Sequence, residues 1–159
     1  MKLYHGTNQF FDKIDLTKSK PNKDFGRGFY LSPNYEQALC MANIKAEQLQ
    51  YGKPLVLTYE ISEIQLQSLN VHRFDEYNKE WAEFIVANRN NALIHNQHRY
   101  DVVIGPIADD RVGTQLWRYE NQLIDLQTLI ERLKYMKGMT IQYFFGTKKA
   151  ISMLKRIDL

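Results

Sequence analysis

Cysteine is almost absent from this chain, since Cys40 is the single cysteine among 159 residues. An internal disulfide is therefore excluded, and such low cysteine usage fits a reducing compartment. Cys40 stands among apolar neighbours in a predicted helix, which favours an inert packing thiol over a catalytic nucleophile. The sequence also lacks a run of about 20 apolar residues and a charged-then-apolar leader at its N-terminus. We therefore expect a cytoplasmic protein with no membrane partner.

Clustered metal ligands are lacking as well. His72, His95 and His98 stand without a second ligand at the spacing that metal sites use. A Walker-type lysine loop is absent, and the GRG segment at 26–28 lacks the third glycine of a dinucleotide fingerprint, because position 31 is leucine. That segment also precedes a predicted strand rather than a helix. The sequence thus predicts no metal site and disfavours a Rossmann dehydrogenase.

The chain has the length and apolar content of one ordinary domain. Hydrophobic residues make up 44% and charged residues 25% of the chain, as in typical globular proteins. The net charge of +3 is mildly basic and does not by itself indicate a nucleic-acid partner. Because no repeat, low-complexity stretch or linker is present, we expect a single domain over residues 1–159.

Hydrophobic periodicity and turn residues predict a mixed order of strands and helices. Strands are expected at residues 1–7, 29–32, 54–61, 68–74, 100–105 and 140–145. Helices are expected from Ser32 or Asn34 to Gly52, over 75–90, over 122–138 and over 147–154. In the third of these helices, an apolar face runs from Leu123 to Met136. The strands are too scattered for a regular βαβ series, so the expected fold class is α+β.

Two short glycine-containing segments carry the strongest indication of function. They are LYHGT at residues 3–7 and FGRGFYLS at residues 25–32. Glycine lets backbone amides approach a ligand closely, Tyr30 offers a ring face, and His5 offers a ring nitrogen to a hydroxyl. Side by side, these two strands would form a slot for a flat, nucleotide-sized ligand.

These segments resemble the first two motifs of the ADP-ribosyltransferase superfamily, in the branch of diphtheria toxin and the poly(ADP-ribose) polymerases that uses a His-Tyr-Glu triad. The resemblance is closest to a bacterial family of small stand-alone domains and extends over nearly the whole chain, including residues 81–89, 101–110 and 142–145. It implies an ADP-ribosyltransferase-like split, twisted β-core with flanking helices. It also implies NAD+ as co-substrate.

The resemblance assigns roles to individual residues. His5 would hydrogen-bond the adenosine ribose of NAD+, the Gly6 backbone would pair with the nicotinamide carboxamide, and Tyr30 would lie against the nicotinamide ring. The third catalytic position falls on Gln142. The other NAD+-binding positions implied are Thr7, Gly26, Arg27, Gly28, Phe29, Ser32, Ala38 and Met41.

Two positions depart from the family pattern. Gln142 stands where glutamate is usual, and an amide can hydrogen-bond a ribose hydroxyl but cannot act as a general base. This difference argues against chain elongation and favours single transfer, hydrolysis or reduced activity. Met41 stands where poly(ADP-ribose) polymerases place a further tyrosine, although a thioether can still pack on a ring.

Charged residues near these motifs allow two interpretations each. Lys23 and Arg27 are either solvated loop residues or cations that neutralise the NAD+ pyrophosphate. Asp109, with its neighbours Asp110 and Arg111, either caps the next segment or contacts an acceptor at the rim of the pocket.

The sequence therefore predicts an NAD+-dependent mono-ADP-ribosyltransferase that modifies a protein or nucleic-acid acceptor. Family analogy suggests the toxin of a toxin–antitoxin pair, with a cognate antitoxin as partner. Two alternatives stay open. One is a non-catalytic module that binds NAD+ or ADP-ribose, which Gln142 favours, and the other is a protein-interaction domain with an aromatic surface.

Overall fold

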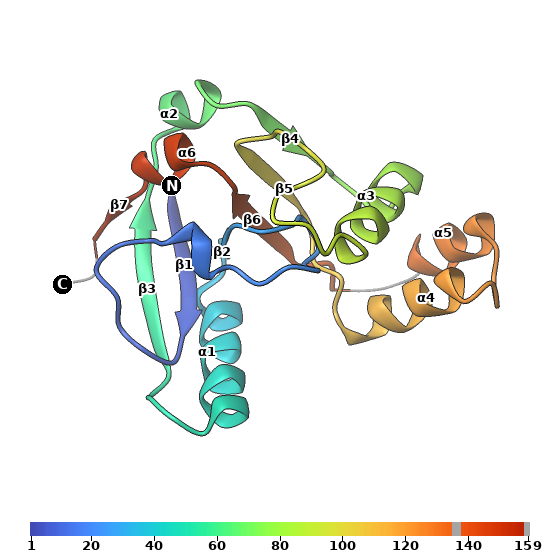
Figure 1. Cartoon of the computed structure of the whole chain (residues 1–159), viewed down its shortest axis with the longest axis horizontal. Coiled ribbons are helices and arrows are strands. Elements are labelled where there is room, and N and C mark those ends of the chain that lie inside the picture. Colours follow the sequence, from blue (N-terminus) through green and yellow to red (C-terminus); the bar gives the residue numbers. More distant parts are fainter. Residues whose placement is uncertain (135–137, 158–159) are drawn as a thin grey trace.

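The strands of the computed structural model, which describes residues 1–134 and 138–157, form two sheets (Figure 1). In the described residues, one sheet has the order β1-β3-β7 and the other the order β2-β6-β5-β4. All neighbours pair antiparallel except β4 and β5, which are parallel. The strands are β1 Lys2–Thr7, β2 Phe29–Leu31, β3 Leu55–Glu60, β4 Val71–Arg73, β5 Val102–Pro106, β6 Ile141–Phe145 and β7 Lys155–Arg156.

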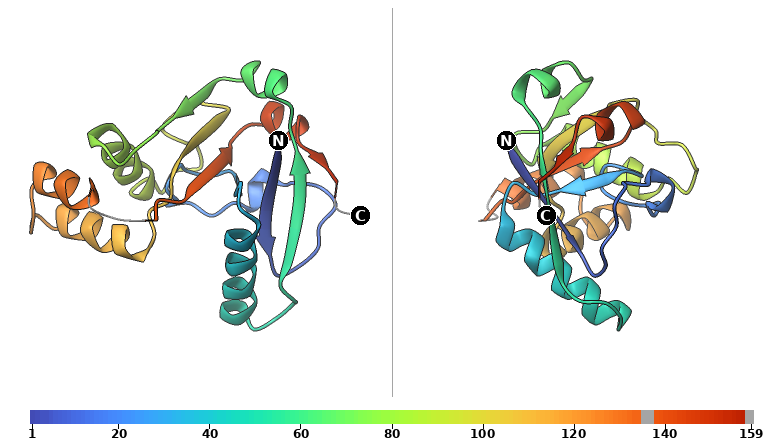
Figure 2. Two further views of the ribbon diagram at one scale, coloured as in Figure 1. Left: turned by 180° about the vertical axis from the view of Figure 1, so that it is seen from behind. Right: turned by 90° about the vertical axis from the view of Figure 1, so that its left-hand side faces the viewer.

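The helices divide between the two sheets. The helices are α1 Tyr35–Leu49, α2 Glu63–Gln67, α3 Lys79–Arg89, α4 Asp110–Glu120, α5 Leu126–Lys134 and α6 Lys148–Ser152. Helix α1 packs against β1 and β3, whereas α3, α4 and α5 pack on one another beside the four-stranded sheet (Figures 1 and 2). Within the described ranges, no helix is both long enough and apolar enough to cross a bilayer. The predicted α+β class is confirmed.

Side-chain caps explain where several helices begin. Asn34 accepts a hydrogen bond from the backbone of Gln37 and so caps α1, while Asn78 caps α3 through the amide of Trp81. Asp109 caps α4 by accepting from the amides of Arg111 and Val112. Such caps satisfy amides that have no partner within the helix. The interpretation of Asp109 as a capping residue is confirmed.

Three expectations need correction. The helix expected from residue 75 begins at Lys79, because Asn78 supplies its cap. The helix expected from residue 122 begins at Leu126, so Leu123 precedes it and is 63% exposed; Met136 lies outside the described residues. Cys40 is exposed on α1 rather than packed, because Ala38 and Ala42 face the sheet.

The four-stranded sheet separates two apolar clusters. Side chains alternate between the faces of a strand, so Phe29 and Leu31 of β2 join the cluster shared with β1 and β3, while Tyr30 packs against the cluster under α3, α4 and α5. Strand β6 alternates in the same way, with Phe145 on the first side and Phe144 on the second. Residues of this sheet therefore reach both halves of the molecule.

The two sheets meet at an isolated bridge between Tyr4 and Ser32. Each of these residues donates its amide to the carbonyl of the other, at 2.8 Å in both directions. Strands β1 and β2 are assigned to different sheets, so the pairing does not continue as a regular ladder beyond this bridge. The two strands therefore diverge beyond this bridge, and we call the place where they part the gap between the sheets.

Candidate functional site

The backbone of Gly6 faces the gap between the sheets. In an antiparallel strand the peptide groups point alternately to one side and the other. Tyr4 bonds Ser32 of the neighbouring sheet, so Gly6, two residues further along β1, turns its amide and carbonyl the same way, away from β3. The Gly6 carbonyl accepts a hydrogen bond from Lys45 Nζ of α1 at 2.6 Å. The strand thus offers a backbone donor and acceptor at the point of divergence.

His5 is wedged between the diverging strands as a neutral imidazole. Its Nδ1 lies 2.8 Å from the Tyr30 carbonyl oxygen, and because a carbonyl can only accept, Nδ1 carries the proton. Its ring stacks on Phe29 with 4.4 Å between centroids. Burial, followed by the charge of Lys45, lowers the His5 pKa to about 3. Nε2 is therefore left as a hydrogen-bond acceptor.

Tyr30 uses its hydroxyl to hold the glycine loop, which we define as residues 25–28. The hydroxyl donates to the Gly26 carbonyl at 2.6 Å and accepts from the Phe25 amide at 3.1 Å. Burial raises the Tyr30 pKa well above its ordinary value, so the phenol stays protonated. Lys23 Nζ stands 4.8 Å from the ring centroid. The ring thus already holds a cation at one face.

Gln142 lies on the same face of the four-stranded sheet as Tyr30. Tyr30 pairs with Phe144, and Gln142 precedes Phe144 by two residues on β6, so their side chains share a face. Gln142 is buried, with 9% of its surface exposed. Its Nε2 donates to Asp24 Oδ2 at 3.2 Å, and Asp24 directly precedes the glycine loop.

Of the predicted catalytic residues, His5 contacts the Tyr30 backbone carbonyl while its ring packs on Phe29, on the side of the sheet opposite to the Tyr30 ring. Gln142 shares the Tyr30 side and approaches the glycine loop through Asp24. Two lysines join this group. Lys45 and Lys23 both lower the pKa of His5, and burial followed by the charge of Lys23 lowers the pKa of Lys45 to about 8.

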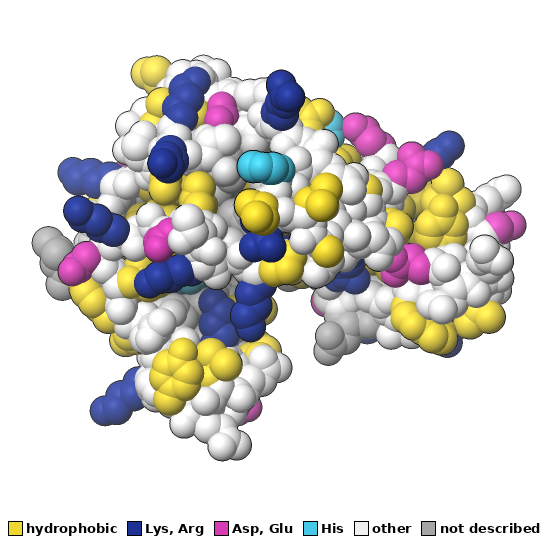
Figure 3. Space-filling model, viewed as in Figure 1, with side chains coloured by type: hydrophobic (Ala, Val, Ile, Leu, Met, Phe, Trp, Pro, Cys, Tyr) yellow, Lys and Arg dark blue, Asp and Glu magenta, His cyan; other side chains and the backbone are white. Residues whose placement is uncertain are grey.

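The surface is hollowed between α1 and α4, with Lys and Arg side chains gathered on its α1 side (Figure 3). We call this hollow the cleft.

The two glycines of the loop are required by packing within the protein. A Cβ at Gly28 would overlap the ring of Phe144. Gly26 has φ +91°, and a Cβ there would overlap the side chain of Asn96. Their space is taken by the protein's own side chains. The amides of Gly26 and Gly28 also donate within the fold, to the Lys23 carbonyl and to Ser19 Oγ.

Several side chains expected to bind NAD+ are engaged within the fold. The guanidinium of Arg27 donates to the carbonyls of Ser19 and Leu93. Thr7 donates its hydroxyl to the Gln9 carbonyl. Ser32 accepts the Asn34 amide and donates to Gln37 Oε1, at the start of α1. Arg27 thus braces a loop, whereas Lys23 and Lys45 are the cations beside His5.

Phe29 and Ala38 are buried residues that pack against His5 and Gly6, respectively. Phe29 is buried beneath the His5 ring. Ala38 is buried on α1, and its carbonyl lies so close to Gly6 that a Cβ at Gly6 would overlap it. Met41, one turn further along α1, is 49% exposed. Of these three residues, Met41 is the one available to a ligand.

Sequence reasoning missed Lys45 and the partners of Gln142. Lys45 follows Met41 by four residues, which places both on one face of α1; that spacing was the available indication. Asp24 was treated as part of a polar loop and Arg89 as a helix-stabilising residue. Their contact joins positions 65 residues apart, and the sequence carries no local sign of it.

A comparison with protein-family models gives one match, described as a protein of unknown function (DUF3990), over residues 1–156. The chain belongs to the DUF3990 family. No curated protein and no solved structure matches significantly. The DUF3990 region includes every strand and helix described above, so His5, Tyr30 and Gln142 all belong to it.

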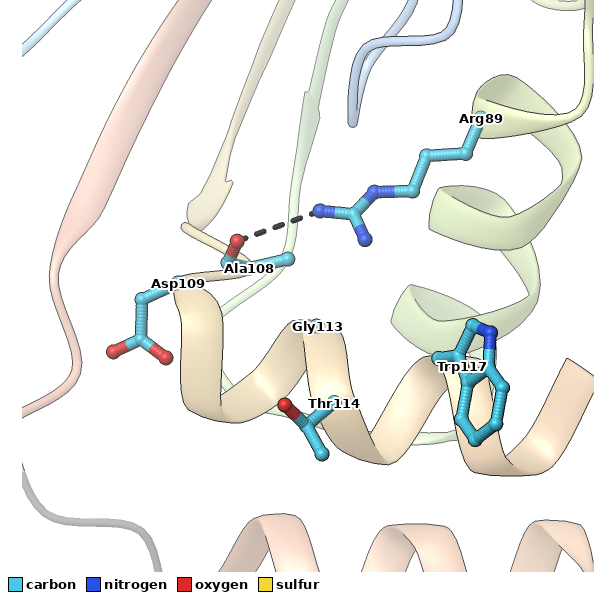
Figure 4. A pocket seen from close by; sticks show the side chains of 6 residues that line it. All are labelled: Arg89, Ala108, Asp109, Gly113, Thr114 and Trp117. Atoms are coloured by element: carbon cyan, nitrogen blue, oxygen red, sulfur yellow. Dashed lines mark hydrogen bonds between the residues drawn. The ribbon is translucent and has the colours of Figure 1, made fainter. Parts of the chain in front are cut away.

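The DUF3990 chain has a second hollow, beside α4. It has a volume of about 500 Å³ and is lined by Arg89, Ala108, Asp109, Gly113, Thr114 and Trp117 (Figure 4). The Arg89 side chain extends over α4 toward Ala108, whose carbonyl it reaches at 3.4 Å. Asp109 therefore both caps α4 and lines a hollow. In the part of the chain that the structure describes, no group of three His, Cys, Asp or Glu side chains could hold a metal ion.

Proposed function

We propose that this DUF3990 protein is an NAD+-dependent mono-ADP-ribosyltransferase that acts on a macromolecular acceptor in the cytoplasm. The observation that carries the proposal is the arrangement around the gap between the sheets. There the Gly6 carbonyl is bonded to Lys45, a neutral His5 is bonded to the Tyr30 carbonyl, and Lys23 stands over the Tyr30 ring.

The residues present suit each part of NAD+. A carboxamide needs one donor and one acceptor, which the backbone of Gly6 offers once Lys45 releases the carbonyl. A ribose hydroxyl can donate to His5 Nε2, which the low pKa keeps unprotonated. The pyrophosphate requires cations, and charged hydrogen bonds from Lys45 and Lys23 supply them.

Tyr30 holds Lys23 where the pyridinium would lie. The ammonium stands 4.8 Å from the ring centroid, and a positive ring gains the same kind of attraction to an aromatic face, about 0.5–2 kcal/mol. Exchange of one cation for the other would free Lys23 for the phosphates. The attraction disappears when nicotinamide becomes neutral, which favours its departure.

The reaction breaks the bond between the ribose C1 and the nicotinamide nitrogen, and nicotinamide keeps the electron pair. A nucleophilic atom of the acceptor then bonds C1 and releases its proton to solvent. Positive charge develops on the ribose in between, as in glycoside hydrolysis. Gln142 can fix a ribose hydroxyl but cannot remove a proton from the acceptor, so we expect single transfer rather than chain elongation.

The test is incubation of the purified protein with labelled NAD+ and a bacterial lysate. We expect nicotinamide release and label transfer to a macromolecule, and loss of both in His5→Ala and Tyr30→Ala. His95→Ala is the matched control because His95 is exposed in a loop. Folded wild-type protein that releases no nicotinamide and transfers no label would refute the proposal.

The amide at position 142 favours one alternative, a module that binds NAD+ or ADP-ribose without turnover. Calorimetric binding of NAD+ by the wild type, with no nicotinamide release, would select it. The toxin hypothesis is tested separately by expression in bacteria. Growth arrest by the wild type and not by His5→Ala would support it.

A further inference from the structure

Asp24 is the centre of a closed hydrogen-bond network beneath Gln142. Its Oδ1 accepts from Arg89 Nε at 2.9 Å and Nη2 at 2.8 Å. Its Oδ2 accepts from the Ala108 amide and from Gln142 Nε2, each at 3.2 Å. The Asp24 side chain is 13% exposed. Four donors thus converge on one carboxylate that is largely withdrawn from water.

This network fixes the orientation of the Gln142 amide. A carboxylate can only accept hydrogen bonds, whereas an amide has a donating and an accepting end. The reverse orientation would bring the Gln142 oxygen against Asp24 Oδ2, with no proton between them. Nε2 is therefore held toward Asp24, and Oε1 is left as the end that can meet a ligand.

We propose that Asp24 is the positioning residue for Gln142, and that the two together replace the single glutamate of a His-Tyr-Glu triad. The inference rests on the proposed function. Gln142 supplies the oxygen that accepts the ribose hydroxyl, and Asp24 supplies the negative charge behind it. A hydrogen bond from Nε2 to a carboxylate polarises the amide and strengthens Oε1 as an acceptor.

The network also bears on the transition state. Positive charge develops on the ribose as nicotinamide leaves. The Gln142 Oε1 dipole, fixed in orientation by the Asp24–Arg89 ion pair, can face that charge without reorganisation. Arg89 holds the Asp24 carboxylate in place through two donors. Because Gln142 supplies the hydrogen-bond acceptor and Asp24 orients it, an amide can serve at a position that usually requires a carboxylate.

The proposal predicts that glutamate at position 142, as in the His-Tyr-Glu triad, lowers the transferase activity. Gln142→Glu would put two carboxylates at hydrogen-bond distance in a site with little water, and one of them must then take up a proton. The exchange Asp24→Asn with Gln142→Glu restores a donor, an acceptor and one negative charge between these two positions, at the loss of the acceptor for the Ala108 amide. Activity should therefore return in the double variant.

Steady-state nicotinamide release, with kcat and KM measured separately, tests this in the wild type, Asp24→Asn, Gln142→Glu and the double variant. We expect each single change to lower kcat roughly tenfold or more and the double variant to recover most of it, as for coupled neighbours. The matched control is Asp101→Asn, whose carboxylate is bonded to Asn70 and Thr147 at the other end of β5. It should lower thermal stability and leave kcat unchanged.

If Asp24→Asn folds poorly, the pH dependence of kcat in Gln142→Glu provides a second test. Protonation of one carboxyl in Gln142→Glu recreates a donor between the pair, so its kcat should rise relative to the wild type as the pH falls. An active Gln142→Glu with a wild-type profile, or a double variant no better than either single one, would overturn the proposal.

A readout independent of catalysis separates this inference from the proposed function. In an NMR spectrum, the Gln142 side-chain amide should show one proton shifted downfield by the carboxylate, and Asp24→Asn should remove that shift. Absence of the shift in the wild type overturns the positioning role. A shifted amide in a protein that releases no nicotinamide retains the positioning role but refutes the proposed transferase function.

Discussion

At the scale of single residues, His5 is the side chain most altered by its surroundings. The ring is fixed by a hydrogen bond to the Tyr30 carbonyl and by stacking on Phe29, and two lysines discourage its protonation. A surface histidine would titrate near pH 6.5. This one remains a neutral acceptor through the physiological range, as binding of a hydroxyl requires.

The low pKa of His5 predicts a loss of stability in acid. The unfolded chain binds a proton near pH 6.5, whereas the folded protein binds it only near pH 3. Between these values the unfolded state holds more protons, so the free energy of unfolding falls as the pH drops. Melting temperatures from pH 7 to pH 4 should show a shallower decline in His5→Gln than in the wild type. Equal slopes would contradict the assignment.

Gly6 makes a second prediction at this scale. A Cβ there would overlap the Ala38 carbonyl, which belongs to the backbone of α1 and cannot move aside. Gly6→Ala should destabilise the protein by about 3 kcal/mol, at the upper end for overpacking. Gly113→Ala is the control. It lies in α4, where the nearest atom is 3.9 Å away, and should stabilise by about 0.5–1 kcal/mol. Urea denaturation measures both.

At the scale of elements, α4 and α5 form a pair that joins the second apolar cluster. Leu116 of α4 and Leu129 and Leu133 of α5 are all buried there. Leu116→Ala should lower the free energy of unfolding by about 2–5 kcal/mol, as expected when a buried leucine leaves a cavity. Chemical denaturation checks this, with the exposed Leu123→Ala as control. Equal effects of the two changes would show that the helix pair packs differently.

The sequence predicted elements well where local features define them. The cap at Asn34, the β2 segment beside the glycine loop and the strand before Pro106 follow from neighbouring residues. Helix α4 was missed because Gly113 interrupts its pattern and leaves Val112 and Leu116 as the residues at helical spacing. Leu123 caused the opposite error. It is an apolar residue in a turn, and its spacing made the apolar face of α5 look longer than the helix is.

Contacts between distant segments account for what the sequence could not predict at the site. His5 and Tyr30 were identifiable because each lies in a recognisable motif. Asp24 reaches Gln142 across 118 positions, and no local pattern records that contact. The function of Gly6 likewise depends on where β2 leaves β1, which is a property of the assembled sheets.

At the scale of the whole molecule, the small net charge of +3 conceals an uneven distribution. Lys23 and Lys45 both lower the pKa of His5, and the charge of Lys23 also lowers the pKa of Lys45. Such local fields attract anions even when the overall charge is modest. The surroundings of His5 are therefore suited to a ligand that carries phosphates.

Lys45 provides the test at this scale. Lys45→Met should raise the Kd for NAD+ roughly tenfold, the effect expected from loss of one charged hydrogen bond. In the wild type, binding should weaken above about pH 8, where Lys45 loses its charge. Lys149→Met is the matched control, because Lys149 also donates to a backbone carbonyl, that of Ser68. Calorimetry that finds equal Kd values for the two variants would contradict the role.

The bridge between Tyr4 and Ser32 has a mechanical consequence. Each sheet keeps its own strand partners, and the two are joined by this backbone bridge and by one apolar cluster to which both contribute. A rotation of one sheet against the other would keep every ladder bond but disturb this shared packing. The distance between the sheets beside His5 is therefore set by buried side chains as well as by the bridge.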